Sequence, residues 1–209
     1  MTDPTFDAEY YTSNNYENYL ERTFDALADD LENVLMLRKD DIIIDFGCGF
    51  GGLVNALHAR GYSNTLGTDI SNWAIDYGKA KFPNIKYSLQ YYNRNVLDEI
   101  NDHVIALDVL EHMPEHEIET VLNLASRRLQ GYFIARMPVS NIEGEAFVLD
   151  VSNKDRTHIT CHPKKWWYDM FRNTGYTLVG TVNEAAMYDS PGVLVGVWRA
   201  AHMPERGAI

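Results

Sequence analysis

Short apolar runs along the chain alternate with stretches in which apolar residues recur every three or four positions. The runs are typical of strands buried on both faces, and the recurring stretches predict amphipathic helices. We therefore expect an α/β domain. The expected strands span 42–44, 65–68, 84–89, 103–109, 132–137, 176–182 and 193–198, and the expected helices span 20–37, 53–59, 72–82, 114–128 and 163–173.

A glycine-rich stretch follows the first expected strand directly, in the sequence DIIIDFGCGFGGL at 41–53. The strand ends at Asp45, and the loop then contains Gly47, Cys48 and Gly49 before the helix begins. Glycines let a ligand approach the backbone, and a helix start offers free N–H groups. This arrangement predicts a nucleotide-sized binding site, although a tight turn without a ligand is the alternative.

The spacing Gly47, Gly49, Gly52 satisfies GxGxxG, which both dinucleotide sites and methyl-donor sites use. Asp45 distinguishes the two classes. A carboxylate at this position would repel the pyrophosphate of a dinucleotide, whereas it suits a ligand that carries an ammonium and a sulfonium group. S-adenosylmethionine is such a ligand.

Three motifs in order, DFGCGFGG, LGTDIS and ALDVLEHMP, resemble those of class I S-adenosylmethionine-dependent methyltransferases, and in particular small-molecule methyltransferases of types 11 and 12. The resemblance covers about 35–139 and is looser beyond. It implies a Rossmann-like, doubly wound sheet of seven strands, mostly parallel, with an antiparallel last strand. It also implies S-adenosylmethionine as the cofactor.

Further donor-binding residues follow from spacing and from the resemblance. Asp69 ends the second strand about 20 residues after the glycine loop, where an acid is expected to accept the ribose hydroxyls. Ile70 follows it. The alternative is that Ser71 caps the next helix while Asp69 is merely solvated. Relatives have an acid after the third strand for the adenine amino group, and here Gln90 or Tyr91 would contact the base instead.

The N-terminal segment and the fourth strand supply two more candidates. Tyr11 belongs to a tyrosine-rich segment that would close over the donor, as in similar methyltransferases, or would simply pack against the domain. Asp108 lies at the carboxyl end of the fourth strand, where doubly wound sheets bind their ligands.

Two histidines are candidates for the base that removes a proton from the methyl acceptor. His112 follows the fourth strand, and its alternative role is to bond the backbone at a helix start. His158 lies in a DRTH stretch that resembles one in some small-molecule methyltransferases, where Asp155 would orient it. The alternative for His158 is a surface position in a mobile loop. We expect Glu111 to be structural.

The histidine spacing gives little support for a metal site. His112 and His116 are four residues apart, but Pro114 interrupts them, and neither CxxC nor HExxH occurs. We expect no metal.

Composition narrows the choice of partners. The chain has 209 residues, a formal net charge of −12 and a pI of about 4.9. No basic patch is evident, so nucleic acid is disfavoured and a small-molecule acceptor is favoured. Two free thiols, Cys48 and Cys161, suit a reducing cytoplasm. No signal peptide or membrane-length apolar run is evident. The oligomeric state cannot be predicted.

We therefore predict one methyltransferase domain that transfers a methyl group to oxygen or nitrogen of a small molecule by direct in-line displacement, with a histidine base. A nicotinamide-dependent oxidoreductase and a non-catalytic partner protein that binds S-adenosylmethionine are the alternatives. The expected parts of domain 1–209 are a lid and leading helix at 1–37, a donor-binding core at 38–139, a substrate loop at 140–160, a C-terminal helix and strands at 161–199, and a tail at 200–209.

Overall fold

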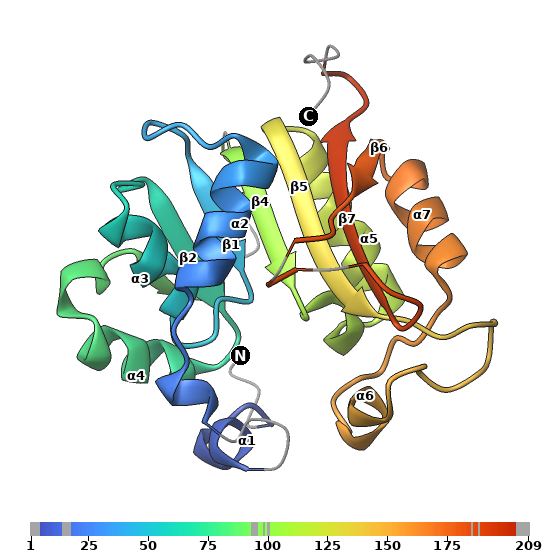
Figure 1. Cartoon of the computed structure of the whole chain (residues 1–209), viewed down its shortest axis with the longest axis horizontal. Helices are drawn as coiled ribbons and strands as arrows, with labels where there is room; N and C mark the ends of the chain where they lie inside the picture. Colours follow the sequence, from blue (N-terminus) through green and yellow to red (C-terminus); the bar gives the residue numbers. More distant parts are fainter. Residues whose placement is uncertain are drawn as a thin grey trace. The chain divides into compact units, whose positions relative to one another are not determined.

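The computed structural model describes residues 5–13, 18–92, 96–97, 99, 101–184, 186–187 and 189–203. The chain divides into two compact units, Met1–Asn93 and Arg94–Ile209. Each unit is an α/β arrangement of its own, and Figure 1 shows their elements in chain order. The single domain expected over 1–209 remains a prediction.

The first unit is built on three parallel strands in the order β3-β2-β1. Strands β1 and β2 are buried along almost their whole length. This agrees with the apolar run in β1, which is typical of a strand covered on both faces. The bounds are α1 Ala8–Thr12, η2 Tyr19–Glu21, α2 Asp25–Leu35, β1 Ile43–Phe46, α3 Gly52–Ala59, β2 Thr65–Asp69, α4 Asn72–Lys81, η3 Pro83–Ile85 and β3 Leu89–Tyr91.

Helices of the first unit pack on its strands and on one another. Helix α3 contacts α2 and β2, while α4 contacts β2, β3 and α1. Ser71 caps α4 by accepting a 3.0 Å hydrogen bond from the N–H of Ala74, as the sequence predicts. A core cluster joins the glycine loop to these helices through Cys48, Val54 and Leu89.

The second unit contains four strands in the order β4-β5-β7-β6. Strands β4 and β5 are parallel, and β7, the last strand of the chain, is antiparallel to both of its neighbours. The bounds are β4 Asn101–Leu107, η5 Leu110–His112, α5 Glu115–Ser126, β5 Leu129–Pro138, α6 Asp150–Lys154, α7 Lys164–Asn173, β6 Tyr176–Thr181 and β7 Val193–Ala200.

Aromatic packing anchors α7 to the strands of the second unit. The ring of Phe171 stacks on that of Trp198 with their centroids 3.9 Å apart, and Phe133 meets Phe171 edge to face. Helix α7 therefore lies against β6 and β7, as Figure 1 shows. This packing fixes the C-terminal half of α7, the helix that follows the predicted substrate loop.

The predicted class, a Rossmann-like α/β fold with a seven-stranded, mostly parallel sheet and an antiparallel last strand, is confirmed. Several expected bounds were wrong, and the predicted substrate loop contains an additional helix. Residues 84–89 are not a strand, because Pro83 begins a short 3-10 helix and β3 covers only Leu89–Tyr91. The leading helix begins at Asp25 rather than Leu20. The loop at 140–160 contains the short helix α6.

Candidate functional site

The glycine loop of the first unit turns sharply between β1 and α3. Gly47, Gly49 and Gly51 have φ angles of 80°, 54° and 79°, in the left-handed region that favours glycine. The N–H groups of Gly47 and Cys48 both donate to the carbonyl of Thr68, at 2.8 and 3.1 Å. The loop is thus held against the end of β2 by its own backbone.

Two buried carboxyl groups, Asp45 and Asp69, lie at the ends of the neighbouring strands β1 and β2. Burial, and then the charge of Asp69, raises the pKa of Asp45 to about 7. Burial also raises the pKa of Asp69, although backbone hydrogen bonds oppose it. Among the described residues neither group forms an ion pair. The two carboxyl groups therefore form a buried acidic pair of the kind that a cationic ligand stabilises.

Asp69 fastens the glycine loop to the turn after β2. Its Oδ2 accepts a 2.8 Å hydrogen bond from the N–H of Gly49, and its Oδ1 accepts one of 2.8 Å from the N–H of Ser71. The alternative of a merely solvated Asp69 is wrong, because the residue is buried. Each carboxylate oxygen has a second lone pair that can accept a ligand hydroxyl.

Aromatic residues from the N-terminal segment lie on the glycine loop. Tyr11 is buried and stacks on Trp73 and Tyr19, with ring centroids 5.5 and 5.9 Å away. Burial, reinforced by the charge of Asp69, raises the pKa of Tyr11. A Cβ atom at Gly49 would stand 2.7 Å from the hydroxyl oxygen of Tyr19. The segment therefore packs directly against the loop, within the same unit.

The remaining predicted donor contacts lie near the ends of β2 and β3. Ile70 is 37% exposed and directly follows Asp69. Gln90 is exposed on β3. Tyr91 is engaged with α4, since its hydroxyl donates to Asp76 at 2.6 Å and Lys79 lies over its ring. Ile70 and Gln90 thus present free side-chain surface, whereas the ring of Tyr91 already has partners.

In the second unit, Asp108 directly follows the last residue of β4, in a constrained conformation. Its φ angle is 56°, and its carboxylate accepts a bidentate pair of hydrogen bonds from the guanidinium of Arg136 on β5. The N–H of Asp108 also donates to the carbonyl of Arg136 at 2.8 Å. This clamp fixes the turn that leads into η5, where His112 lies.

His112 is oriented by a short relay of hydrogen bonds. Its Nδ1 lies 2.8 Å from Oγ1 of Thr157, and that hydroxyl donates to Asp155 at 2.5 Å. Burial, and then the charge of His158, lowers the pKa of His112 to about 4. Burial alone would raise the pKa of Asp155, but the hydrogen bonds from Thr157 outweigh it and hold the pKa below its usual range. His112 is therefore neutral near pH 7.

His158 lies against His112, with ring centroids 4.6 Å apart. Its side chain is only 10% exposed, so the alternative of a surface histidine is wrong. Its Nδ1 bonds the carbonyl of Ser152 at 2.9 Å, while Asp155 is 3.8 Å from its Nε2. The carbonyl of Ser152, rather than Asp155 alone, thus orients the ring.

Glu111 connects the two segments that carry these histidines. Its carbonyl accepts hydrogen bonds from the N–H groups of Ile159 and Thr160, at 2.9 and 3.0 Å. We therefore name Glu111, His112 and His158 the histidine cluster. The sequence predicted both histidines, but not that they meet, nor that Thr157 and Ser152 orient them, because no local spacing records contacts across some 45 residues.

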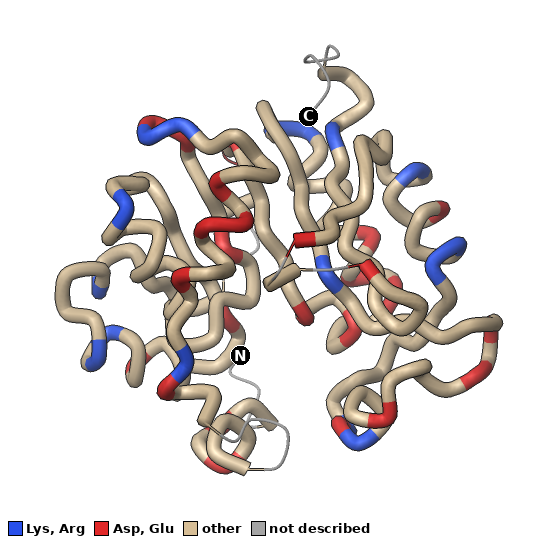
Figure 2. Tube along the Cα trace, viewed as in Figure 1, with Lys and Arg blue, Asp and Glu red and all other residues tan. Residues whose placement is uncertain are grey.

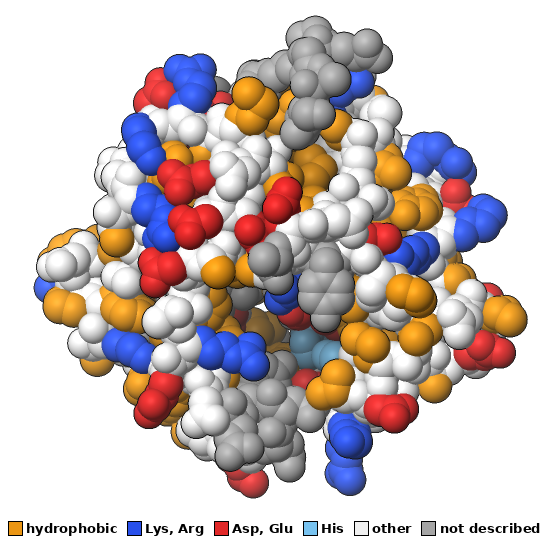
Figure 3. All heavy atoms as spheres, viewed as in Figure 1, with side chains coloured by type: hydrophobic (Ala, Val, Ile, Leu, Met, Phe, Trp, Pro, Cys, Tyr) orange, Lys and Arg blue, Asp and Glu red, His pale blue; other side chains and the backbone are white. Residues whose placement is uncertain are grey.

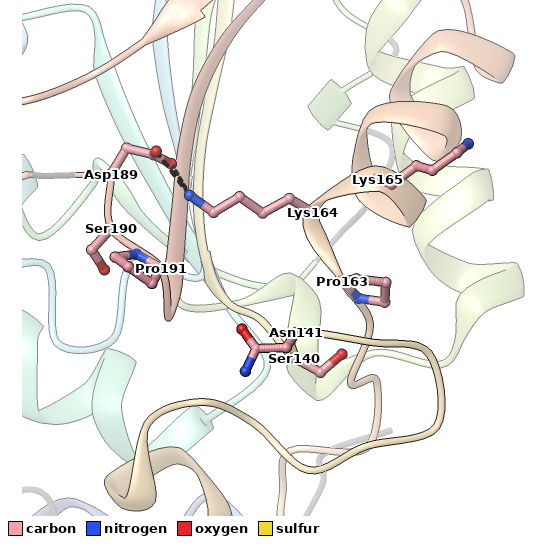
Figure 4. A pocket seen from close by; sticks show the side chains of 8 residues that line it. All are labelled: Ser140, Asn141, Pro163, Lys164, Lys165, Asp189, Ser190 and Pro191. Atoms are coloured by element: carbon pink, nitrogen blue, oxygen red, sulfur yellow. Dashed lines mark hydrogen bonds and ion pairs between the residues drawn. The ribbon is translucent and has the colours of Figure 1, made fainter.

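A shallow hollow of about 610 Å³ lies elsewhere on the second unit. Figure 4 shows that Lys164 at the start of α7 reaches Asp189, and the ion pair has N–O distances of 2.7 and 2.8 Å. Ser140 and Asn141, the first residues of the predicted substrate loop, line the opposite side. None of the predicted site residues lines this hollow.

Charges on the described surface are mixed rather than segregated. Acidic positions follow one another along α2, where Arg60 pairs with Asp25 and Asp29 (Figure 2). On the face in Figure 3, Lys and Arg side chains lie singly or in small groups beside acidic ones. The prediction of two free thiols is confirmed. In the part of the chain that is described, no helix has the length and apolar character needed to cross a membrane.

Comparison with known proteins finds a match to a methyltransferase family in the middle of the chain. Residues 43–131 match the family described as "Methyltransferase domain". A ribosomal protein L11 methyltransferase from Staphylococcus saprophyticus is 28% identical over 102 residues, which are 47% of this chain and 32% of that protein. The match thus spans about a third of the curated relative.

Solved structures share the fold over most of the chain. A putative methyltransferase in complex with the Trm112 activator from Haloferax volcanii has a TM-score of 0.68 at 17% identity, over 91% of this chain and 94% of that one. Magnesium protoporphyrin IX methyltransferase from Synechocystis, with bound S-adenosylhomocysteine, has a TM-score of 0.63 at 18% identity, over 95% and 100%. These solved structures share the fold of the chain, and the family match at 43–131 agrees with the resemblance to class I S-adenosylmethionine-dependent methyltransferases.

Proposed function

We propose that the protein transfers a methyl group from S-adenosylmethionine to oxygen or nitrogen of a small-molecule acceptor. The single observation that carries this proposal is the pair Asp45 and Asp69, buried at adjacent strand ends beside a bare glycine loop. A cationic ligand offsets the free-energy cost of burying these carboxylates, whereas a phosphate-bearing ligand adds charge repulsion to that cost. The matched methyltransferase family and the solved neighbours support the same conclusion.

In the proposed donor site, Asp45 faces the positive charge of the donor beside the loop of Gly47, Cys48 and Gly49. The N–H groups of these three residues shape the loop, because they already donate to Thr68 and Asp69. Asp69 receives the ribose hydroxyls through the lone pairs that Gly49 and Ser71 leave free. Hydrogen bonds to a charged group contribute about 1.5–3 kcal/mol each, so this contact alone favours an adenosyl ligand.

The adenine would rest on the exposed side chain of Ile70 and hydrogen-bond to Gln90. This assignment follows from their surfaces at the ends of β2 and β3. We give Tyr91 and Asp108 weaker roles, because Asp76 and Arg136 already occupy their polar groups. Tyr11 would close the donor site as part of the packed N-terminal segment.

Transfer would proceed by direct attack of the acceptor on the methyl carbon, in line with the departing thioether. Holding both reactants aligned supplies about 7–11 kcal/mol. No covalent enzyme intermediate is required. The acceptor loses its proton to Nε2 of His158 or His112, and the latter is neutral near pH 7 because its pKa is about 4. Asp155 and Thr157 orient the pair.

Two other functions are weighed against this one. A nicotinamide-dependent oxidoreductase would place a pyrophosphate against Asp45, which is unfavourable. A non-catalytic partner protein would use the same donor site without the histidine cluster. Release of S-adenosylhomocysteine across a panel of hydroxyl and amine acceptors tests transfer directly. Donor binding without release for any acceptor would favour the partner protein. The acidic composition and the free thiols support a small-molecule acceptor and a cytoplasmic location.

A further inference from the structure

The carboxylate of Glu111 is the least satisfied polar group near the proposed catalytic residues. Its residue is 0% exposed, and neither Oε1 nor Oε2 has a hydrogen-bond partner within the described part of the chain. A buried carboxyl group without a partner is strongly unfavourable in either protonation state, because the protonated form also leaves its hydroxyl unpaired. The group therefore calls for a ligand that the described residues do not supply.

Hydrogen bonds fix the tautomer of His158. Its Nδ1 lies 2.9 Å from the carbonyl oxygen of Ser152, and a carbonyl can only accept. The proton of the neutral imidazole is therefore on Nδ1, which leaves a lone pair on Nε2. That atom lies 3.9 Å from Oε1 of Glu111.

The tautomer of His112 follows from the same reasoning. The hydroxyl of Thr157 has one proton, which it donates to Asp155 at 2.5 Å. Its oxygen, 2.8 Å from Nδ1 of His112, must then accept from that nitrogen. His112 also keeps its lone pair on Nε2. Outer partners that hold the Nδ1 proton of a histidine in this way are typical of metal-binding imidazoles.

We propose that Glu111, His112 and His158 bind a divalent first-row transition-metal ion such as Zn²⁺. One ligand atom from each of the three residues lies within 4.8 Å of the others. Two ligands at about 2.1 Å from a common ion stand at most about 4.2 Å apart, so the 3.9 Å between Glu111 and His158 already fits, and small side-chain rotations bring the set together.

The donor set selects the kind of ion. Two imidazoles and one carboxylate suit Zn²⁺ and related transition metals, whereas Mg²⁺ and Ca²⁺ prefer oxygen ligands. Three protein ligands leave at least one coordination position for an acceptor oxygen. A bound ion would lower the pKa of that hydroxyl and so replace the histidine base, since the same Nε2 lone pair cannot serve both roles. The metal site itself does not depend on methyl transfer.

Metal content of the purified full-length chain tests the site. After removal of metal with a chelator and dialysis against Zn²⁺, we expect one ion per chain by mass spectrometry, and a higher unfolding temperature than for the metal-free protein. Replacement with Co²⁺ should give visible absorption bands of a site with nitrogen and oxygen ligands. Absence of stoichiometric Zn²⁺ and of these bands would overturn the proposal.

Variants separate this site from adventitious binding. Glu111→Gln and His158→Gln should each weaken Zn²⁺ binding at least about tenfold, with far-UV circular dichroism as the test of folding. His162→Ala is the matched control, because His162 pairs with Glu115 and Glu143 outside the cluster. Equal binding by the wild type and either folded cluster variant would contradict the proposal, as would loss of the ion in the control alone.

The same samples distinguish failure of the metal site from failure of the proposed function. A titration of metal-free protein with S-adenosylmethionine reports only on the donor site of the first unit. Donor binding without metal binding would overturn the metal proposal and leave a histidine base. Metal binding without donor binding would support the metal site and contradict the proposed methyl transfer.

Discussion

The N–H of Gly49 donates a 2.8 Å hydrogen bond to Oδ2 of Asp69, twenty residues further along the chain. This bond joins the glycine loop after β1 to the acid that ends β2. The loop that leaves room for the donor and the carboxylate proposed to hold its ribose therefore form one rigid element. Substitutions in either part should act on donor affinity.

Asp45 is predicted to reduce stability in the absence of a ligand. Its pKa of about 7, against about 4 in an unfolded chain, means that ionisation opposes folding on the order of 4 kcal/mol at pH 8. Asp45→Asn should therefore raise the unfolding temperature at pH 8, and the gain should shrink as the pH falls from 7 toward 4. The exposed Asp40→Asn is the control, and a lower unfolding temperature for Asp45→Asn alone would contradict this prediction.

The affinity for S-adenosylmethionine should depend on pH through the same group. The cationic donor binds the ionised carboxylate, so below about pH 7 the free protein must lose a proton on binding. We expect the affinity to fall by up to about tenfold per pH unit below 7, and to be flat above it. Calorimetry from pH 5.5 to 8.5 measures this. In Asp45→Asn the slope should vanish, and an unchanged slope in that variant would assign it to another group.

Asp69→Asn should lower the affinity for S-adenosylmethionine by about ten- to a hundredfold, since a charged hydrogen-bond acceptor is lost while the shape of the side chain is kept. The amide oxygen can still accept from the N–H of Gly49, but the bond from the N–H of Ser71 is lost, so far-UV circular dichroism is the check that the variant is folded. Asp29→Asn, which removes a surface partner of Arg60, should leave donor affinity within about twofold. Equal affinities for both variants would remove Asp69 from the donor site.

Gly49→Ala tests the close packing of the loop. The φ angle of 54° disfavours any side chain, and the new Cβ would stand 2.7 Å from the hydroxyl oxygen of Tyr19. We expect donor affinity to fall at least about tenfold. Gly180→Ala is the matched control, because no atom lies within 4 Å of its Cβ and its φ is not left-handed. Unchanged donor affinity in both variants would contradict the close packing of the loop at Gly49.

His158→Ala should lower kcat by about 10²–10⁴-fold with little change in donor affinity, once an acceptor is found. This result is expected whether His158 acts as base or as metal ligand. His116→Ala is the control, since its side chain is 78% exposed and lies outside the cluster. An unchanged kcat in His158→Ala would exclude His158 from catalysis.

Local sequence patterns predict the residues of the proposed donor site. They do not predict the histidine cluster, because that cluster depends on contacts between residues far apart in the sequence. The glycine loop, Asp45 and Asp69 occupy strand ends that hydrophobic runs identify directly. The third strand was misplaced because, of its three residues, only Leu89 is buried, so no apolar run marks β3. Glu111 was expected to be structural, and its buried, unpartnered carboxylate becomes evident only when the segment around His158 folds onto η5.

The most direct test of the donor site is a calorimetric titration of the purified protein at pH 8 with S-adenosylmethionine and, separately, with NADH. We expect saturable heat at one site per chain with S-adenosylmethionine, a large loss of affinity in Asp45→Asn, and no saturable heat with NADH. Saturable binding of NADH together with no response to S-adenosylmethionine would contradict the claim that the buried carboxyl pair selects a cationic adenosyl ligand.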